Sequence, residues 1–327
     1  MRKAFLTLVM LGSLSATAIA GELNLNGGIG YRFDSVELAA GPKSEKDRLG
    51  AELVLSNKVN DKINAVVGLR TGSFNSQYDD MGPGGQLKDV NLHLAYVEYA
   101  AMDNVKVTLG KMHQPWASSP SLFFDRDVKP EGVAVSWKSE SGLFANASSL
   151  KLVEGGINDD SKVQSLQVGL HKNLAGLHFK GAVALHDHKI KHVAIGGISD
   201  AKLQQAFASV GTKFAGKPVV LFADYMKNDK ASADDTALAY GIKFGHAKKP
   251  QEWDLSVLHQ DVEANAQFGL WNDSDFALSQ GGHKGYGLVG GYVVADGWKV
   301  NAKYFDVERG ANSADYKRLQ IDLLYMF

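Results

Sequence analysis

The chain has 327 residues, with 35 Lys and Arg against 36 Asp and Glu, and a formal net charge of −1. This balance gives no support to nucleic-acid binding, which needs a basic surface. Cysteine is absent, so disulfides do not stabilise the fold even if the protein is exported.

The first twenty residues have the form of a secretory signal peptide. Arg2 and Lys3 supply early positive charge, the apolar run AFLTLVMLG follows, and small residues lead to Ala20. This is an A-x-A cleavage site before Gly21, and the apolar run is too short for a transmembrane anchor. We expect residues 1–20 to be removed, leaving residues 21–327 as one domain.

Alternation of apolar and polar residues recurs through the rest of the chain in segments of strand length. Such alternation predicts strands with one apolar and one polar face. Sixteen segments have this pattern: about 23–33, 49–55, 63–69, 90–101, 105–112, 132–138, 142–153, 166–170, 177–185, 204–214, 218–227, 238–244, 253–257, 284–294, 298–307 and 317–327.

The connections between these segments alternate in length, seven being short and eight long. Both ends of the chain therefore fall on the short-turn side. In transmembrane β-barrels the short turns face the periplasm and the long loops face outward. The sequence predicts a sixteen-stranded antiparallel barrel; a secreted soluble sandwich is the alternative that alternation alone does not exclude.

The third long loop, Gln114 to Pro130, is the best candidate for narrowing such a barrel. Its prolines restrict its conformations. The loop carries an apolar group that we expect to pack on the inner wall and a charged group that we expect to face the lumen. The two groups are Trp116, Phe123 and Phe124, and then Asp125, Arg126 and Asp127. The alternative is an ordinary extracellular loop tip, because loops usually lie outside.

Three further patterns resemble ligand sites but have simpler interpretations. His186, His188 and His192 offer ligands for zinc or copper, but a solvated loop is the better interpretation of this run. Asn272 to Asp275 offers oxygen ligands for calcium but lacks the twelve-residue loop with its closing glutamate. Gly285 to Gly290 spells GxGxxG, but a strand follows it where a nucleotide site needs a helix. We therefore predict no metal and no cofactor.

The last nine residues close the pattern. Leu319, Ile321, Leu323, Tyr325 and the terminal Phe327 form one apolar row, with Gln320 and Asp322 on the other face. The ending resembles the closing strand of bacterial outer-membrane barrels, with a lipid-facing stripe and a wet interior.

Because inward and outward positions alternate along each strand, the position of each charged residue in its strand shows whether it faces the inner wall. We call this rule parity. Arginines fall on the polar face of the last strand and of the first three, which barrel closure makes neighbours: Arg318, Arg32, Arg48 and Arg70. Guanidinium groups stay charged and fork toward carboxylates and phosphates. Together with Lys180, Lys243, Lys299 and Lys303, they predict a weak anion preference. The alternative is a mixed lumen whose charges pair locally.

The segments LGKMHQPWASSPSLFFDRDVKPEGVAVSW, DSDFALSQGGHKGYGLVGGYVV and RLQIDLLYMF resemble the porins of Gram-negative bacteria, related in style to the phosphate-selective porins. The resemblance implies a sixteen-stranded, water-filled pore in the outer membrane. It also implies a homotrimer that passes small hydrophilic solutes or ions. Two other functions stay open: a barrel enzyme of the lipase or protease type, and a sealed structural or adhesion barrel. No Gly-x-Ser-x-Gly motif supports the enzyme.

Overall fold

The computed structural model describes residues 22–73, 76–82, 88–153, 160–191, 200–267, 269, 272–278, 281–310 and 313–327. The predicted signal peptide, residues 1–20, lies outside the described residues, and so does His192. Among the described residues, no helix is long and apolar enough to cross a membrane.

Strands dominate the described chain. In order they are β1 (Glu22–Leu38), β2 (Ser44–Lys58), β3 (Ile63–Thr71), β4 (Asp79–Asp80), β5 (Val90–Met102), β6 (Val105–Lys111), β7 (Glu131–Lys138), β8 (Leu143–Val153), β9 (Ser161–Leu174), β10 (Leu177–Lys189), β11 (Asp200–Phe214), β12 (Lys217–Asn228), β13 (Thr236–Gly245), β14 (Trp253–Val262), β15 (His283–Ala295), β16 (Trp298–Arg309) and β17 (Ala314–Met326). One short helix, α2 (Ser274–Ala277), lies between β14 and β15.

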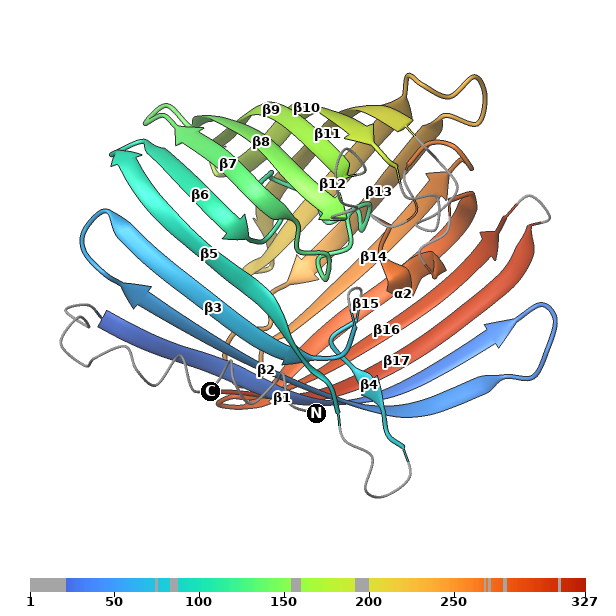
Figure 1. The fold of residues 1–327 in the computed structure, drawn as a ribbon. Coiled ribbons are helices and arrows are strands. Elements are labelled where there is room, and N and C mark those ends of the chain that lie inside the picture. Colours follow the sequence, from blue (N-terminus) through green and yellow to red (C-terminus); the bar gives the residue numbers. More distant parts are fainter. Residues whose placement is uncertain are drawn as a thin grey trace.

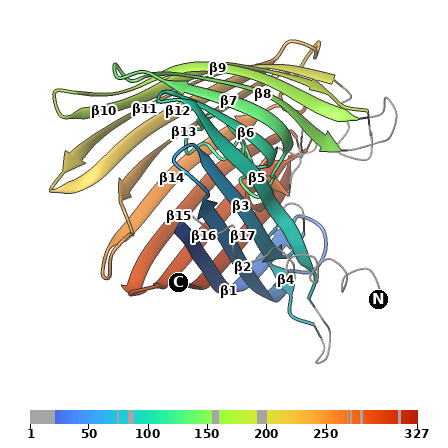
Figure 2. The same cartoon turned by 60° about the vertical axis from the view of Figure 1, so that its left-hand side comes forward.

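The sheet closes on itself (Figures 1 and 2). Each strand pairs antiparallel with its neighbour, and β1 pairs with β17 on one side and β2 on the other. Apart from the two-residue β4, sixteen described strands form the ring. The predicted barrel is confirmed, and the sandwich is excluded because a sandwich has open sheet edges.

The alternation in sequence becomes an inside-out distribution of side chains. On β17, Tyr316, Arg318 and Gln320 are buried inside the ring, while Leu319 and Ile321 are exposed outside it. The exposed apolar row is the arrangement expected where the outer wall contacts lipid. The end of the chain is tied to β1, because Phe327 and Gly27 exchange two backbone hydrogen bonds of 3.0 and 2.9 Å.

Two predictions about local structure are settled by the strand boundaries. Gly285 to Gly290 lies within β15, so its glycines are strand residues as expected. The histidine run differs from the expectation of a solvated loop, because β10 continues to Lys189 and buries His186 and His188 inside the barrel.

Candidate functional site

The segment between β6 and β7, residues 112–130, crosses the inside of the barrel. The Ala117 N–H donates to Gln167 Oε1 on β9 (2.8 Å), and Gln167 Nε2 donates back to the Ala117 carbonyl (2.9 Å). Lys180 on β10 donates to the Ser118 carbonyl at 3.1 Å. We call this segment the constriction loop. It lies in the lumen, so the alternative of an extracellular loop tip is wrong.

A buried carboxylate on β12 holds the tip of the constriction loop. The hydroxyls of Ser119 and Ser121 donate to Asp224 Oδ2 at 2.6 and 2.7 Å. Gln205 Nε2 donates to both oxygens of the same carboxylate, at 2.9 and 3.1 Å. Among the described residues, Asp224 forms no ion pair within 4 Å. Neutral donors alone therefore balance its desolvation.

The apolar side of the constriction loop fills one half of the lumen. Trp116, Phe123 and Phe124 are buried in one cluster with side chains from the β8–β14 wall. The Trp116 ring lies 4.9 Å from the His186 ring, and the Phe124 ring lies 5.4 Å from it. His186 also hydrogen-bonds Ser165 at 2.8 Å. His186 therefore packs against the apolar side of the loop, opposite the wall formed by β17 and β1–β3.

The four predicted arginines line that opposite side, but each has an acidic partner. Arg32 makes two hydrogen bonds to Asp322, of 2.6 and 2.9 Å. Arg318 makes two to Asp34, of 2.8 and 2.6 Å.

The other two arginines are paired as well. Arg48 lies 3.0 Å from Asp80 and 3.4 Å from Asp34. Arg70 donates to Asp127 of the constriction loop at 3.0 Å. Arg70 and Asp127 are therefore in direct contact, and the arginine is not free to face the lumen. The wall is a paired network rather than a free cationic surface.

A second inward segment, missed from the sequence, completes this network. Asp275 on α2 accepts a hydrogen bond from Lys303 at 2.7 Å and one from Gln320 at 2.9 Å. It also lies 3.3 Å from Arg318 and 3.6 Å from Arg32. The Asn272–Asp275 stretch therefore supplies a counter-charge to the arginines. Among the described residues, no group of three His, Cys, Asp or Glu side chains is placed to hold a metal ion.

The two inward segments are joined to each other. The Ser274 N–H donates to Asp125 Oδ2 (3.2 Å), and the Asp273 N–H donates to the Leu122 carbonyl (3.4 Å). Burial, with the nearby carboxylates of Asp273 and Asp127, raises the pKa of Asp125 to about 8. Lys303 and the two arginines instead lower the pKa of Asp275 against the effect of burial. Burial therefore favours the protonated form of Asp125, whereas the surrounding cations favour the ionised form of Asp275.

A third segment enters the lumen between β3 and β4. Tyr78 is buried beneath Arg32, whose guanidinium carbon lies 4.2 Å from the ring centroid. This stacking places Gln77 beside the constriction loop. Gly30 and Gly50 leave the necessary room, since a Cβ on either would come within 3.0 Å of Tyr78 atoms.

Two of the cavities between these segments and the wall are lined by charged side chains of both. One, of about 320 Å³, includes Arg32, Asp275 and Lys303 in its lining, and the other, of about 370 Å³, includes Glu52, Arg70 and His93. Gln77, Arg126 and Asp127 line both. Arg126 is exposed, so its charged group faces the space where the two cavities meet.

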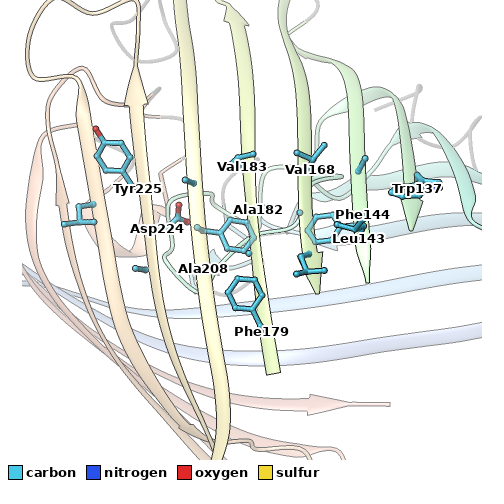
Figure 3. Close-up of a pocket in the computed structure, with 18 residues that line it drawn as sticks. Trp137, Leu143, Phe144, Val168, Phe179, Ala182, Val183, Ala208, Asp224 and Tyr225 are labelled. Carbon is cyan, nitrogen blue, oxygen red and sulfur yellow. The ribbon is translucent and has the colours of Figure 1, made fainter. Parts of the chain in front are cut away.

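A further hollow lies on the outer wall (Figure 3). It measures about 730 Å³ and is lined mainly by outward-facing residues of β8 to β13, among them Val168, Val183, Ala208 and Tyr225. The small side chains in this part of the wall leave a depression in its outer surface. Because its lining is almost entirely apolar, this hollow belongs to the surface that faces lipid.

Comparison with solved structures identifies the architecture. OprB of Pseudomonas putida aligns over 97% of this chain and 97% of its own length, with 12% identity and a TM-score of 0.66. This barrel has the porin fold. Salmonella typhi OmpF, in complex with daunomycin, aligns over 94% and 98% of the two chains, with 12% identity and a TM-score of 0.61. An engineered variant of the Rh. blastica porin aligns over 94% and 100%, with 15% identity and a TM-score of 0.54.

Residues 39–155 match a family model described as "Putative porin". This match and the porin fold confirm the resemblance expected from the sequence. No protein of curated function matches the chain significantly. The matched segment runs from just before β2 to the end of β8 and includes the whole constriction loop.

Proposed function

We propose that this porin-fold protein forms a water-filled channel in the outer membrane for passive diffusion of small hydrophilic solutes. The observation that carries the proposal is the constriction loop, folded inside a closed barrel and leaving cavities lined by charged side chains. Sixteen strands make a barrel too wide for wall side chains alone to fill. Charged linings around an aqueous gap are the means by which pores select among ions.

We further propose a weak anion preference that does not originate in the predicted arginine wall. Arg32, Arg48, Arg70 and Arg318 are each balanced by a carboxylate, so their net field in the lumen is small. The support comes from the exposed Arg126 and from inward lysines such as Lys180, which has no carboxylate within ion-pair distance in the described part of the chain.

The test is conductance of the purified protein in planar bilayers, together with the reversal potential in a salt gradient. We expect discrete conductance steps and a reversal potential on the anion side of zero. Arg48→Glu/Arg70→Glu channels serve as the comparison. Because both arginines are already paired, reversing them adds negative charge and should move the potential toward cations. Wild-type protein that inserts without conductance steps would contradict the channel.

Two alternatives give different results in the same preparation. A sealed structural barrel inserts into the bilayer and gives no conductance steps. A barrel enzyme hydrolyses a lipid or peptide substrate, and this activity is lost when its nucleophile is replaced. The porin fold and the family match favour a non-enzymatic channel over both.

A homotrimer with both ends on the periplasmic side is the arrangement we propose in the membrane. Its support is the implied relation to porins and the short turns that connect β7 to β8, β9 to β10 and β11 to β12. Mass measurement of the unheated detergent complex tests the trimer. Protease access to a tag inserted in a short turn, from one side of the membrane, tests the orientation.

A further inference from the structure

The charge balance of the lumen differs between its two sides. On β17, β1, β2 and β3 the inward arginines are matched by acids. On β7 to β12, in the half nearer the short turns, the inward-facing positions carry Lys138, Lys180 and Lys213 and no Asp or Glu. Asp224, the inward acid higher on this wall, already accepts from Ser119, Ser121 and Gln205.

Lys180 lies at the centre of this unbalanced side. Arg126 of the constriction loop and Lys138 of β7 both act electrostatically on its ammonium, and both are cations. Lys180 is half-buried, donates to the Ser118 carbonyl at 3.1 Å, and lies 5.7 Å from the centroid of the Phe207 ring. Within the part of the chain that the structure describes, none of these three cations has a carboxylate within 4 Å.

The positive charges of Arg126 and Lys138 act unfavourably on the Lys180 ammonium, and an anion bound beside it would relieve the repulsion. Lysine ammonium groups bind oxyanions as point charges, and a guanidinium group can fork onto two oxygens. Arg126 and Lys138 are exposed, so their donors are accessible to a solute. Ser118 and Arg126 also line the cavity of about 370 Å³, together with the acids Glu52 and Asp127, so this cavity adjoins the cluster at its loop end. A cavity of this size is at the lower end of the range for small-molecule sites.

We propose that Arg126, Lys138 and Lys180 form a binding station for an oxyanion-bearing solute, on the short-turn side of the constriction loop. The station rests on the proposed channel and identifies the class of solute that the channel favours: small molecules with a phosphate or carboxylate group. The solute approaches the cluster through the lumen and exchanges water for three cationic donors. The paired arginines on the opposite wall hold the constriction open without binding it.

The test adds inorganic phosphate, or acetate in a parallel arm, to wild-type channels conducting chloride at fixed ionic strength. We expect a saturable fall in chloride conductance. In Lys138→Gln/Lys180→Gln the half-saturating concentration should rise at least about tenfold, the usual effect of losing a charge-assisted contact. Arg126→Gln should raise it alone to a smaller extent. Lys172→Gln, an equal loss of charge on the outward face of β9, is the matched control and should leave it unchanged.

A response to both anions, or to phosphate alone, supports the station and identifies the preferred oxyanion. No saturable response to either, or an equal response in the double variant, overturns it. Calorimetric titration of the detergent-solubilised protein with the same salts measures binding without conductance. Anion binding by a barrel that does not conduct would therefore refute the channel but support the binding station. Conductance without anion binding would support the channel but refute the binding station.

Discussion

The anchor between the constriction loop and β12 offers the sharpest test of how the lumen is narrowed. Ser119→Ala/Ser121→Ala removes two hydrogen bonds to the buried Asp224 carboxylate. A hydrogen bond to a charged group contributes about 1.5–3 kcal/mol, so the pair contributes about 3–6 kcal/mol. Even the lower value shifts the balance between attached and detached loop by roughly 100-fold.

Single-channel recording reports this shift directly. The loop keeps its contacts to Gln167 and Arg70 at its two ends, so we expect the barrel to insert normally. The tip keeps its backbone contacts to Gln260 and Asp273 but is held less firmly, so it should fluctuate more and give larger open-channel noise and higher mean conductance. Recordings identical to wild type in both noise and conductance would refute the assignment of Asp224 as the anchor.

A third substitution separates the anchor from a general loss of packing. The serine double variant leaves Asp224 buried with Gln205 as its remaining side-chain donor. Adding Asp224→Ala removes that stranded charge, so the triple variant should be more stable than the double by about 1–3 kcal/mol. Thermal unfolding of the folded band on unheated gels measures the difference. Additive destabilisation, with the triple variant the least stable, would show that the carboxylate is not stranded.

Three further predictions address charge and the outer wall. Asp125, whose pKa burial and Asp273 raise to about 8, is neutral below that pH and ionised above it, so anion preference should fall as the pH rises through about 8. Reversal potentials of Asp125→Asn channels should lack this step, and an equal step would exclude Asp125 as its source. Asp275→Asn leaves Arg32, Arg318 and Lys303 without their shared carboxylate, so it should strengthen the anion preference of the channel. It should also cost about 3–5 kcal/mol of stability, the usual effect of breaking a buried ion pair. Denaturant unfolding in vesicles measures the loss of stability, and an unchanged reversal potential would contradict the role of Asp275. Ile321→Arg places a charge on the outward face of β17. It should destabilise the folded barrel by about 2–4 kcal/mol if that position lies at the bilayer midplane. An unaffected unfolding curve would mean that Ile321 does not face lipid.

The strands were predictable because the barrel imposes one rule on every residue of its wall. Each inward position faces water or a loop and each outward position faces apolar surroundings, so period two is present in all sixteen segments. The terminal row from Leu319 to Phe327 is the clearest case. The error at His186 and His188 has the same origin, because both occupy inward positions that look polar in sequence although they are buried, and His186 packs against Trp116 and Phe124.

The contacts inside the lumen were only partly predictable. Parity placed Arg32 and Arg318 inward, and composition gave the constriction loop its apolar and charged groups. Parity does not say which residues meet across the lumen, since Arg32 and Asp322 are 290 positions apart. The role of Asp275 depends on a second loop turning inward, and the Asp273-x-Asp275 spacing was the one local signal for it.

These contacts divide the lumen into regions with different physical tasks. Apolar packing of Trp116, Phe123 and Phe124 fixes the constriction loop to one wall. Paired charges stabilise the opposite wall, where Asp275 and the arginines satisfy each other and leave little net field. Selectivity requires charge that is accessible and not already balanced, and Arg126, Lys138 and Lys180 are lumenal residues of this kind in the described part of the chain. The residues that shape the channel and the residues that select its solutes are therefore different sets, and substitutions in one should change conductance while substitutions in the other change ion preference.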